Sequence, residues 1–158
     1  MGIDPLLSAL LLATHIGYVC PDWEAAGRFA DIEAAEAVFE GVVQRIEEDR
    51  TGECAPDRVV FKVRRVWKGA TQSEYVLLQT AERGQEIVVD GQRVLSGCPL
   101  WIEQDWFEAG RSYIVFAARR RGQLESMGCG LSARPSAATR KRLNAWASEQ
   151  QRNGRIKR

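Results

Sequence analysis

Five segments of the chain have the alternating pattern, or the β-branched and aromatic composition, that is typical of β-strands. The second segment alternates most clearly, with apolar residues on one face and mainly basic residues on the other. Its two faces are Val59, Phe61, Val63 and Val60, Lys62, Arg64. The five predicted strands cover residues 37–46, 59–68, 75–80, 113–117 and 124–127.

Glycines and turn residues punctuate these strands in a way that favours a barrel. Gly41, in the middle of the first strand, predicts a bulge or a sharp bend, as barrel closure requires. Residues 86–95 predict a separate hairpin around Asp90-Gly91, a strong signal for a type I′ turn. The pattern therefore predicts a mainly β fold built on a small, partly closed barrel.

Two helices are expected to flank the strands. Residues 22–36 have a rough apolar stripe at helical spacing, and Asp22 is placed to cap them as one helix. Ser136 is placed to cap a second helix over residues 137–149. Its expected buried residues are Leu143 and Trp146.

Composition is that of an ordinary globular domain, but charge is unevenly distributed. The chain has 158 residues, is 45% hydrophobic and 27% charged, and carries a net charge of +1, so composition gives no argument for a nucleic-acid partner. Residues 22–57 hold eleven acidic and three basic residues, whereas residues 134–158 hold eight basic residues and one acidic residue. This asymmetry indicates either a basic tail for anionic surfaces or a solvated helix face.

The cysteine pattern bears on the compartment. The four cysteines are widely spaced and include no C-x-x-C pair, which argues against a structural zinc site. An even number of widely spaced cysteines fits two disulfides in an oxidising compartment, and four cysteines allow three pairings. The alternative is a cytosolic protein with free thiols. The cysteines are Cys20, Cys54, Cys98 and Cys129.

The N-terminal residues 1–19 resemble an export leader. Leu6–Ala13 is an apolar run of signal-peptide length that is too short to span a bilayer, although no Lys or Arg precedes it. A buried N-terminal helix is the alternative. With the disulfide pattern, this leader predicts an extracytoplasmic protein, with membrane contact only through the leader or the basic tail.

Residues for catalysis are sparse. The only histidine, His15, lies in the apolar leader, so a His-based nucleophilic pair is not expected, and no metal-binding or cofactor-binding motif is present. Glu103, Asp105 and Glu108 lie among aromatic residues, where a raised pKa would make a general acid, but an exposed loop that plugs a barrel end is the preferred interpretation. We therefore predict a protein that is not an enzyme.

The basic residues of the second predicted strand have two interpretations, a nucleic-acid contact and a solvated strand face. Lys62, Arg64, Arg65 and Lys68 lie close to Trp67 in the sequence, and small barrels often stack bases on aromatic residues beside basic grooves. A solvated face is preferred, and no nucleic-acid partner is expected.

Taken in order, the motifs resemble the tissue-inhibitor-of-metalloproteinases and netrin-module superfamily, in its bacterial branch. They are a cysteine, a helix, Ala-Val-Phe-Glu-Gly, Phe-x-Val-x-x-Val-Trp-Lys-Gly, a second cysteine, Phe-x-x-Gly-x-x-Tyr-Ile-Val-Phe-Ala, Leu-x-Ser and a last cysteine. The resemblance covers residues 20–134 and implies a five-stranded OB-fold barrel with flanking N-terminal and C-terminal helices. Residues 135–158 then form the C-terminal helix with its basic tail.

The resemblance also implies how the protein would act. Inhibitors of that superfamily chelate a protease zinc through the free amine and carbonyl of an N-terminal Cys-x-Cys, but here Asp22 stands in the third position after Cys20 and Pro21. The loss of one cysteine implies the pairs Cys20–Cys129 and Cys54–Cys98.

The predicted function is a non-enzymatic, disulfide-braced binding module that recognises a protein or surface partner through barrel-end loops, without a cofactor. The alternative is a metalloendopeptidase inhibitor that acts through the edge formed by Cys20 and Pro21. The role of the 81–97 insertion stays open at this point. The expected partner contacts are Trp67, Lys68, Trp101 and Trp106.

Overall fold

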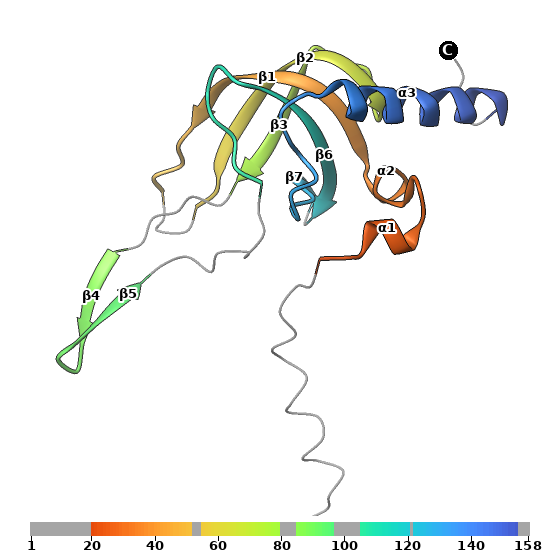
Figure 1. Cartoon of the computed structure of the whole chain (residues 1–158). Helices are drawn as coiled ribbons and strands as arrows, with labels where there is room; N and C mark the ends of the chain where they lie inside the picture. The colour runs from red at the N-terminus through yellow and green to blue at the C-terminus, as the bar shows by residue number, and fades with distance from the viewer. Residues whose placement is uncertain (1–19, 52–54, 80–84, 97–104, 121, 155–158) are drawn as a thin grey trace, which may run out of the picture.

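A computed structural model of the chain describes residues 20–51, 55–79, 85–96, 105–120 and 122–154. Its centre is a closed barrel with the strand order β1-β2-β3-β7-β6 (Figure 1). The pair β3–β7 is parallel, and all other neighbouring pairs in the barrel are antiparallel. The barrel strands are β1 (Ala37–Glu47), β2 (Asp57–Lys68), β3 (Glu74–Gln79), β6 (Ser112–Arg120) and β7 (Gln123–Ser126). The predicted five-stranded, OB-fold-like barrel with flanking helices is thereby confirmed.

The barrel interior is filled by aromatic and aliphatic side chains from the inward face of each strand. Val59 and Phe61 are fully buried, and Val63 packs against the same cluster, as the alternation in the sequence predicts. The Phe39 ring stacks on Tyr75 at 4.4 Å between centroids and meets Phe61 edge-on at 5.4 Å. Such rings add about 0.5–1.5 kcal/mol per pair beyond the area they bury.

Gly41 marks a bulge in the barrel wall, as predicted. The β1–β2 register shifts between Glu40 and Gly41, so that Gly41 lies opposite Val63 while Glu40 lies opposite Arg65. A Cβ atom at Gly41 would come within 2.9 Å of the Lys62 carbonyl oxygen, and only glycine allows the two strands to approach this closely. The extra residue in β2 at this point is Arg64.

The N-terminal helical segment is two short helices, which corrects the prediction of a single helix over residues 22–36. They are α1 (Trp23–Ala26) and α2 (Ala30–Ala34). Asp22 caps α1 as predicted, because its carboxylate accepts a hydrogen bond from the Ala25 N–H at 3.0 Å. The helix stops at Gly27, whose φ of +121° lies outside the helical region and is tolerated by glycine alone.

The C-terminal helix α3 (Ala137–Arg152) begins at Ser136, whose side chain accepts a hydrogen bond from the Thr139 N–H. Leu143 and Trp146 are buried, as the sequence predicts. They join a second apolar cluster that lies between the helices and the outer face of the barrel, where α2 and α3 cover it (Figure 1). Residues of this cluster include Ile32, Val38, Trp67, Ile114 and Phe116.

Two arginines of α3 neutralise acidic residues that lie 100 and 111 positions away in the sequence. Arg140 donates two hydrogen bonds to the buried Glu40 carboxylate at 2.8 and 2.9 Å. Arg142 forms a two-point ion pair with Asp31 and also donates to the Arg28 carbonyl oxygen. Part of the charge asymmetry in the sequence is therefore explained by ion pairs between acidic residues near the start of the domain and basic residues of its last helix.

The Glu40–Arg140 pair predicts a specific pH dependence of stability. The hydrogen bonds from Arg140, followed by the charges of Arg140, Arg64 and Arg65, hold the pKa of Glu40 below its usual value, although burial opposes them. A carboxyl with a lower pKa in the folded state stabilises the fold above its unfolded pKa of about 4.3, and this contribution is lost as the pH falls through the folded value.

We therefore expect wild type to lose more of its unfolding free energy between pH 6 and pH 3 than the Glu40→Gln variant, as measured by urea denaturation. Glu149→Gln is the matched control, because it removes a carboxylate of α3 that takes no part in this pair. It should lose as much unfolding free energy between pH 6 and pH 3 as wild type. Equal losses in wild type and Glu40→Gln would contradict the assignment.

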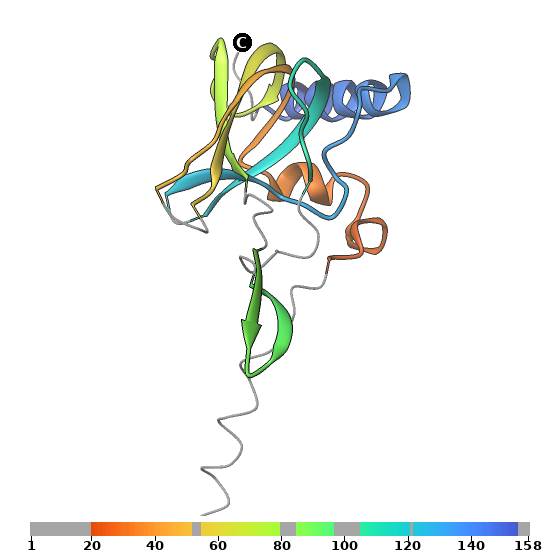
Figure 2. The same cartoon turned by 90° about the vertical axis from the view of Figure 1, so that its left-hand side faces the viewer.

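The strands β4 (Gln85–Val89) and β5 (Gln92–Ser96) form a separate two-stranded sheet outside the barrel. Figures 1 and 2 both show it projecting away from the barrel wall. Asp90 and Gly91 form its turn with φ values of +52° and +77°, which fits the predicted type I′ geometry. Among the described residues, no helix has the length and hydropathy needed to cross a bilayer.

Candidate binding surface at the disulfide-braced end of the barrel

The strand directions define two ends of the barrel. At one end β1, β3 and β7 finish and β2 and β6 begin, and the chain between β3 and β6 carries the β4–β5 hairpin. We call this the hairpin end. The β2–β3 and β6–β7 connections lie at the other end, which we call the opposite end.

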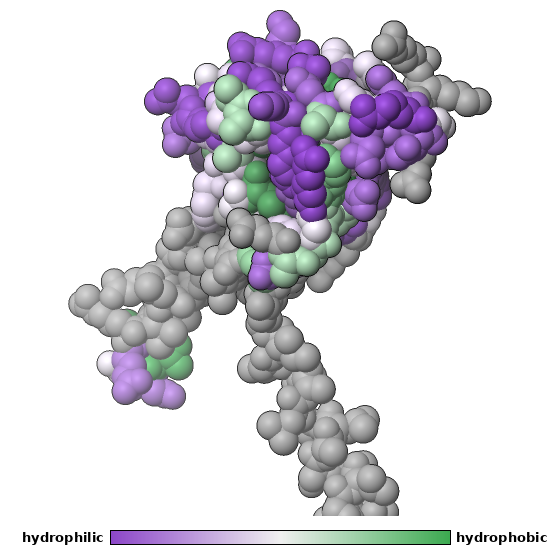
Figure 3. Space-filling view, turned by 45° about the vertical axis from the view of Figure 1, so that its right-hand side comes forward, coloured by the Kyte–Doolittle hydropathy of each residue, from purple (hydrophilic) through white to green (hydrophobic). Residues whose placement is uncertain are grey.

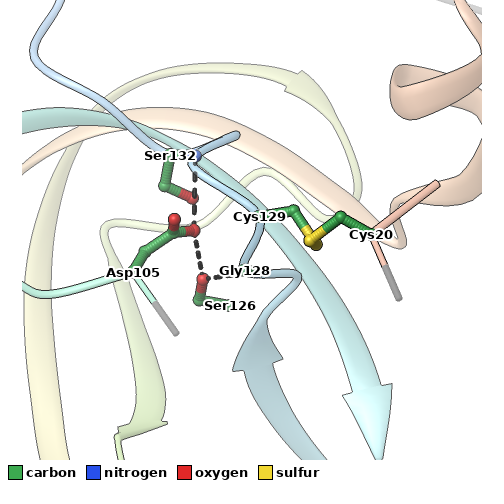
Figure 4. Close-up of a disulfide and its surroundings, with 6 residues drawn as sticks. All are labelled: Cys20, Asp105, Ser126, Gly128, Cys129 and Ser132. Carbon is green, nitrogen blue, oxygen red and sulfur yellow. Dashed lines mark hydrogen bonds between the residues drawn. A yellow bond between two sulfur atoms is a disulfide. The ribbon is translucent and has the colours of Figure 1, made fainter. Parts of the chain in front are cut away.

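A disulfide joins Cys20 to Cys129 beside the hairpin end (Figure 4). Cys129 follows the end of β7 by three residues, and its Cα atom lies 5.6 Å from that of Cys20, within the usual range for disulfides. The bond therefore ties the start of the described chain to the segment after the last strand. It confirms one predicted pair, whereas Cys54 and Cys98 lie outside the described residues.

Asp105 lies buried next to this disulfide and holds three segments together (Figure 4). Its carboxylate accepts hydrogen bonds from the Ser126 hydroxyl and from the Ser132 N–H, the latter at 3.3 Å. The Ser126 oxygen in turn accepts the Gly128 N–H at 3.1 Å. This carboxylate anchors the chain that returns from the hairpin.

The other two carboxylates of the general-acid alternative do not join Asp105 in the described structure. Glu108 is exposed and forms ion pairs with Arg111 and Arg134. Glu103 lies outside the described residues. Among these residues, no group of three or more His, Cys, Asp or Glu side chains is placed to hold a metal ion.

The residues that follow Asp105 alternate between the core and the surface. Phe107 points into the barrel, where its ring meets Phe61 and Tyr113 edge-on at 5.0 and 5.1 Å. Its N–H donates to the Gln79 side-chain oxygen at 3.2 Å. Trp106, between these two anchored neighbours, has 49% of its surface exposed. A large aromatic side chain is thus held outward on a fixed backbone.

The β4–β5 hairpin adds apolar surface to the same stretch of chain. Val88 is 68% exposed and Val89 is 48% exposed, and as successive strand residues they point to opposite faces. Figure 3 shows strongly hydrophobic atoms at the hairpin tip beside hydrophilic ones. An isolated two-stranded hairpin is only marginally stable in water, and the exposed Val88 and Val89 lack the packing that a larger sheet would provide.

The structure separates the three expected contact residues that it describes. Trp67 is only 6% exposed, and its indole N–H donates to the Asn144 side-chain oxygen beneath α3 at 2.9 Å. The Lys68 ammonium donates to the carbonyl oxygens of Ile32 and Glu33 at the end of α2, and partial burial lowers its pKa. Both therefore hold helices on the barrel at the opposite end. Trp106 is exposed at the hairpin end, and Trp101 lies outside the described residues.

The Cys20–Pro21 edge and a cavity at the opposite end have fewer features of a binding site than the hairpin end. Pro21 is exposed directly after the disulfide-bonded Cys20. A small cavity of about 120 Å³ at the opposite end is lined by polar and apolar residues that include Gly69, Tyr75 and Leu124. The Tyr75 hydroxyl is occupied there, because it donates to the Ala70 carbonyl oxygen at 2.6 Å, and burial raises its pKa.

Val88 and Val89 are the surface residues that sequence reasoning did not single out. A signal was present, because the apolar Ile87-Val88-Val89 precedes the Asp90-Gly91 turn within an insertion between barrel strands. Periodicity alone could not show that the insertion forms a sheet separate from the barrel in which Val88 and Val89 are exposed.

The chain matches no protein-family model, no curated protein and no solved structure. The resemblance to the tissue-inhibitor-of-metalloproteinases and netrin-module superfamily therefore remains an expectation that depends on the order of its motifs.

Proposed function

We propose that this protein is a non-enzymatic, extracytoplasmic binding module of the tissue-inhibitor and netrin-module type, and that it recognises a protein partner through the hairpin end. The main observation is the distribution of exposed apolar surface. Three of the four large hydrophobic side chains that are exposed in the described structure lie on the chain between β3 and β6. They are Val88, Val89 and Trp106, and the fourth is Val76.

The chemistry of these residues suits a protein partner. Binding energy in protein interfaces is concentrated in a few anchors, among which tryptophan is enriched, and the buried core around them is apolar. Trp106 has the chemistry of such an anchor, and Val88 and Val89 have that of the apolar core. The hairpin also has two outer edges, because β4 and β5 pair only with each other in the described structure. Unpaired strand edges accept an added strand from a partner, which supplies main-chain hydrogen bonds.

The base of the hairpin end is braced, which lowers the entropic cost of binding. The Cys20–Cys129 disulfide fixes the segment that follows β7, and the buried Asp105 joins the end of β7 to that segment. Phe107 fixes the chain that returns from the hairpin. A contact surface held in its bound geometry loses less conformational freedom when the partner arrives. Disulfides persist in oxidising compartments, which supports an extracytoplasmic location.

Site-specific photo-cross-linking tests this proposal. A photoreactive residue at position 88 should form an adduct with a partner protein in cells, whereas one at Gln72, an exposed residue at the opposite end, should not. With the purified partner, Val88→Asp should weaken binding at least about tenfold, since burying an unpaired carboxylate in the contact costs more than the roughly 1.4 kcal/mol that a tenfold change represents. Gln72→Asp is the control. Equal adduct yields from both positions, or equal affinities of both variants, would contradict the proposal.

A second candidate function is metalloendopeptidase inhibition through the Cys20–Pro21 edge. The observation in its favour is that Cys20 is fixed by a disulfide while Pro21 beside it is exposed. Chelation of a protease zinc requires a free amine on Cys20, so a mature chain that starts at Cys20 should inhibit a zinc endopeptidase. Adding one alanine before Cys20 should abolish that inhibition, and N-terminal sequencing of the exported protein establishes which form exists.

A further inference from the structure

A row of basic residues lies on the outer face of the barrel and forms a surface separate from the hairpin end. It consists of Lys62, Arg64 and Arg65 of β2 together with Arg140 of α3, and we call it the cationic strip. Lys62 and Arg64 both point outward, because Val63 between them packs on the barrel core. The bulge opposite Glu40 adds Arg65 to the same face, so two successive arginines are exposed.

The strip has more positive than negative charge. Glu40 is the carboxylate at its centre, and it is buried and already occupied by both hydrogen bonds from Arg140. Arg65 lies opposite Glu40 in the β1–β2 register and Arg140 binds the same carboxylate, so both flank Glu40, with Arg64 next to Arg65 in the bulge. Within the described part of the chain, the side chains of Lys62 and Arg64 form no hydrogen bond or ion pair.

The nearest other acid does not neutralise Lys62 by direct contact. Glu74 lies opposite Lys62 in the β2–β3 register, but its carboxylate contacts Arg45 at 3.9 Å. The strip thus presents four cations against one buried and one exposed carboxylate. Successive outward residues on a strand lie about 6.8 Å apart, so the free charges are arranged in a line rather than as a compact pocket.

We propose that the cationic strip binds an anionic polysaccharide, a linear polymer that carries sulfate or carboxylate groups. This inference goes beyond the proposed function, because it concerns a different face and a different ligand. Arginine guanidinium groups bind planar or tetrahedral oxyanions through two parallel hydrogen bonds, which lysine does not do. OB-fold barrels bind oligosaccharides as well as oligonucleotides on the face formed by their second and third strands.

The absence of a stacking surface favours a sugar polymer over single-stranded nucleic acid. Proteins that bind single strands in this fold stack the bases on exposed aromatic side chains. Trp67 is the aromatic residue next to the strip, and it is 6% exposed beneath α3, with the Arg65 guanidinium 5.0 Å from its ring centroid. Among the described residues, the exposed aromatic side chain is Trp106, which lies at the hairpin end and away from the strip.

The test measures binding of the full chain to size-defined heparin and oligouronate fragments by calorimetry at several salt concentrations. The variant Lys62→Gln/Arg64→Gln should weaken binding at least about tenfold at 0.15 M salt, because it removes two of the four cations that contact the polyanion. The dependence of affinity on salt should also decrease, because fewer counterions are released. Comparison of the two fragments shows whether sulfate or carboxylate is preferred.

The control variant is Arg50→Gln/Arg111→Gln, which removes the same charge from exposed residues at the hairpin end. It should keep the wild-type affinity, and both variants should unfold at the wild-type temperature. Equal weakening by both variants would show that only net charge matters and would overturn the proposal. Tighter binding to oligo-dT or to vesicles that contain anionic lipid than to either saccharide at the same salt would also overturn it.

Discussion

Replacing Cys20 and Cys129 with serine should lower the free energy of unfolding by about 2–5 kcal/mol, the range found when native disulfides are removed from small domains. The two cysteines are 109 positions apart, so the bond closes a loop that includes every barrel strand. Without it, the unfolded chain gains the conformational freedom of that loop. Urea denaturation of wild type and the double variant, both under oxidising conditions, measures the difference.

Two comparisons show whether the difference comes from the bond. Reductant should shift the urea unfolding midpoint of wild type toward that of the double variant. The variant Cys54→Ser/Cys98→Ser measures the contribution of the second predicted bridge separately. An unfolding midpoint that is the same for oxidised wild type and for Cys20→Ser/Cys129→Ser would show that the bond does not brace the barrel.

Phe107→Ala should lower the free energy of unfolding by about 3–5 kcal/mol, as is usual for removing a buried phenylalanine ring. Phe107 is 5% exposed and contacts two other rings of the barrel core. Phe107 also anchors the chain that returns from the hairpin. Removal of its ring should therefore make the neighbouring backbone amides exchange their hydrogens faster.

The adjacent Trp106→Ala is the matched control for this prediction. Trp106 is 49% exposed, and its removal should change stability by no more than about 0.5 kcal/mol. The proposed function predicts the reverse order for partner binding, which Trp106→Ala should weaken in a chain that is still folded. A large loss of stability from Trp106→Ala, or none from Phe107→Ala, would show that the core and surface roles are wrongly assigned.

The barrel follows directly from the sequence because its signals are local. Alternation in β2 determines which residues face the core, Gly41 marks the bulge, and the Asp90-Gly91 pair marks the hairpin turn. Asp22 and Ser136 are the caps of α1 and α3, as predicted.

The remaining features depend on contacts that local patterns do not encode. The apolar stripe of residues 22–36 continues through Gly27, but the backbone at this glycine leaves the helical region, so one predicted helix becomes two. Trp67 lies on the outward face of its strand, and only the packing of α3 shows that this position is buried. The Glu40–Arg140 and Asp31–Arg142 pairs likewise join distant segments, where the sequence shows only an imbalance of charge.

The most direct test of the hairpin end as a protein-binding surface is hydrogen exchange of the protein, free and in complex with the partner that is cross-linked from position 88. We expect the amides of β4 and β5 to exchange more slowly in the complex, while those of residues 69–73 at the opposite end keep their free rates. Protection confined to the segment after Cys20, or to the opposite end, would contradict the account.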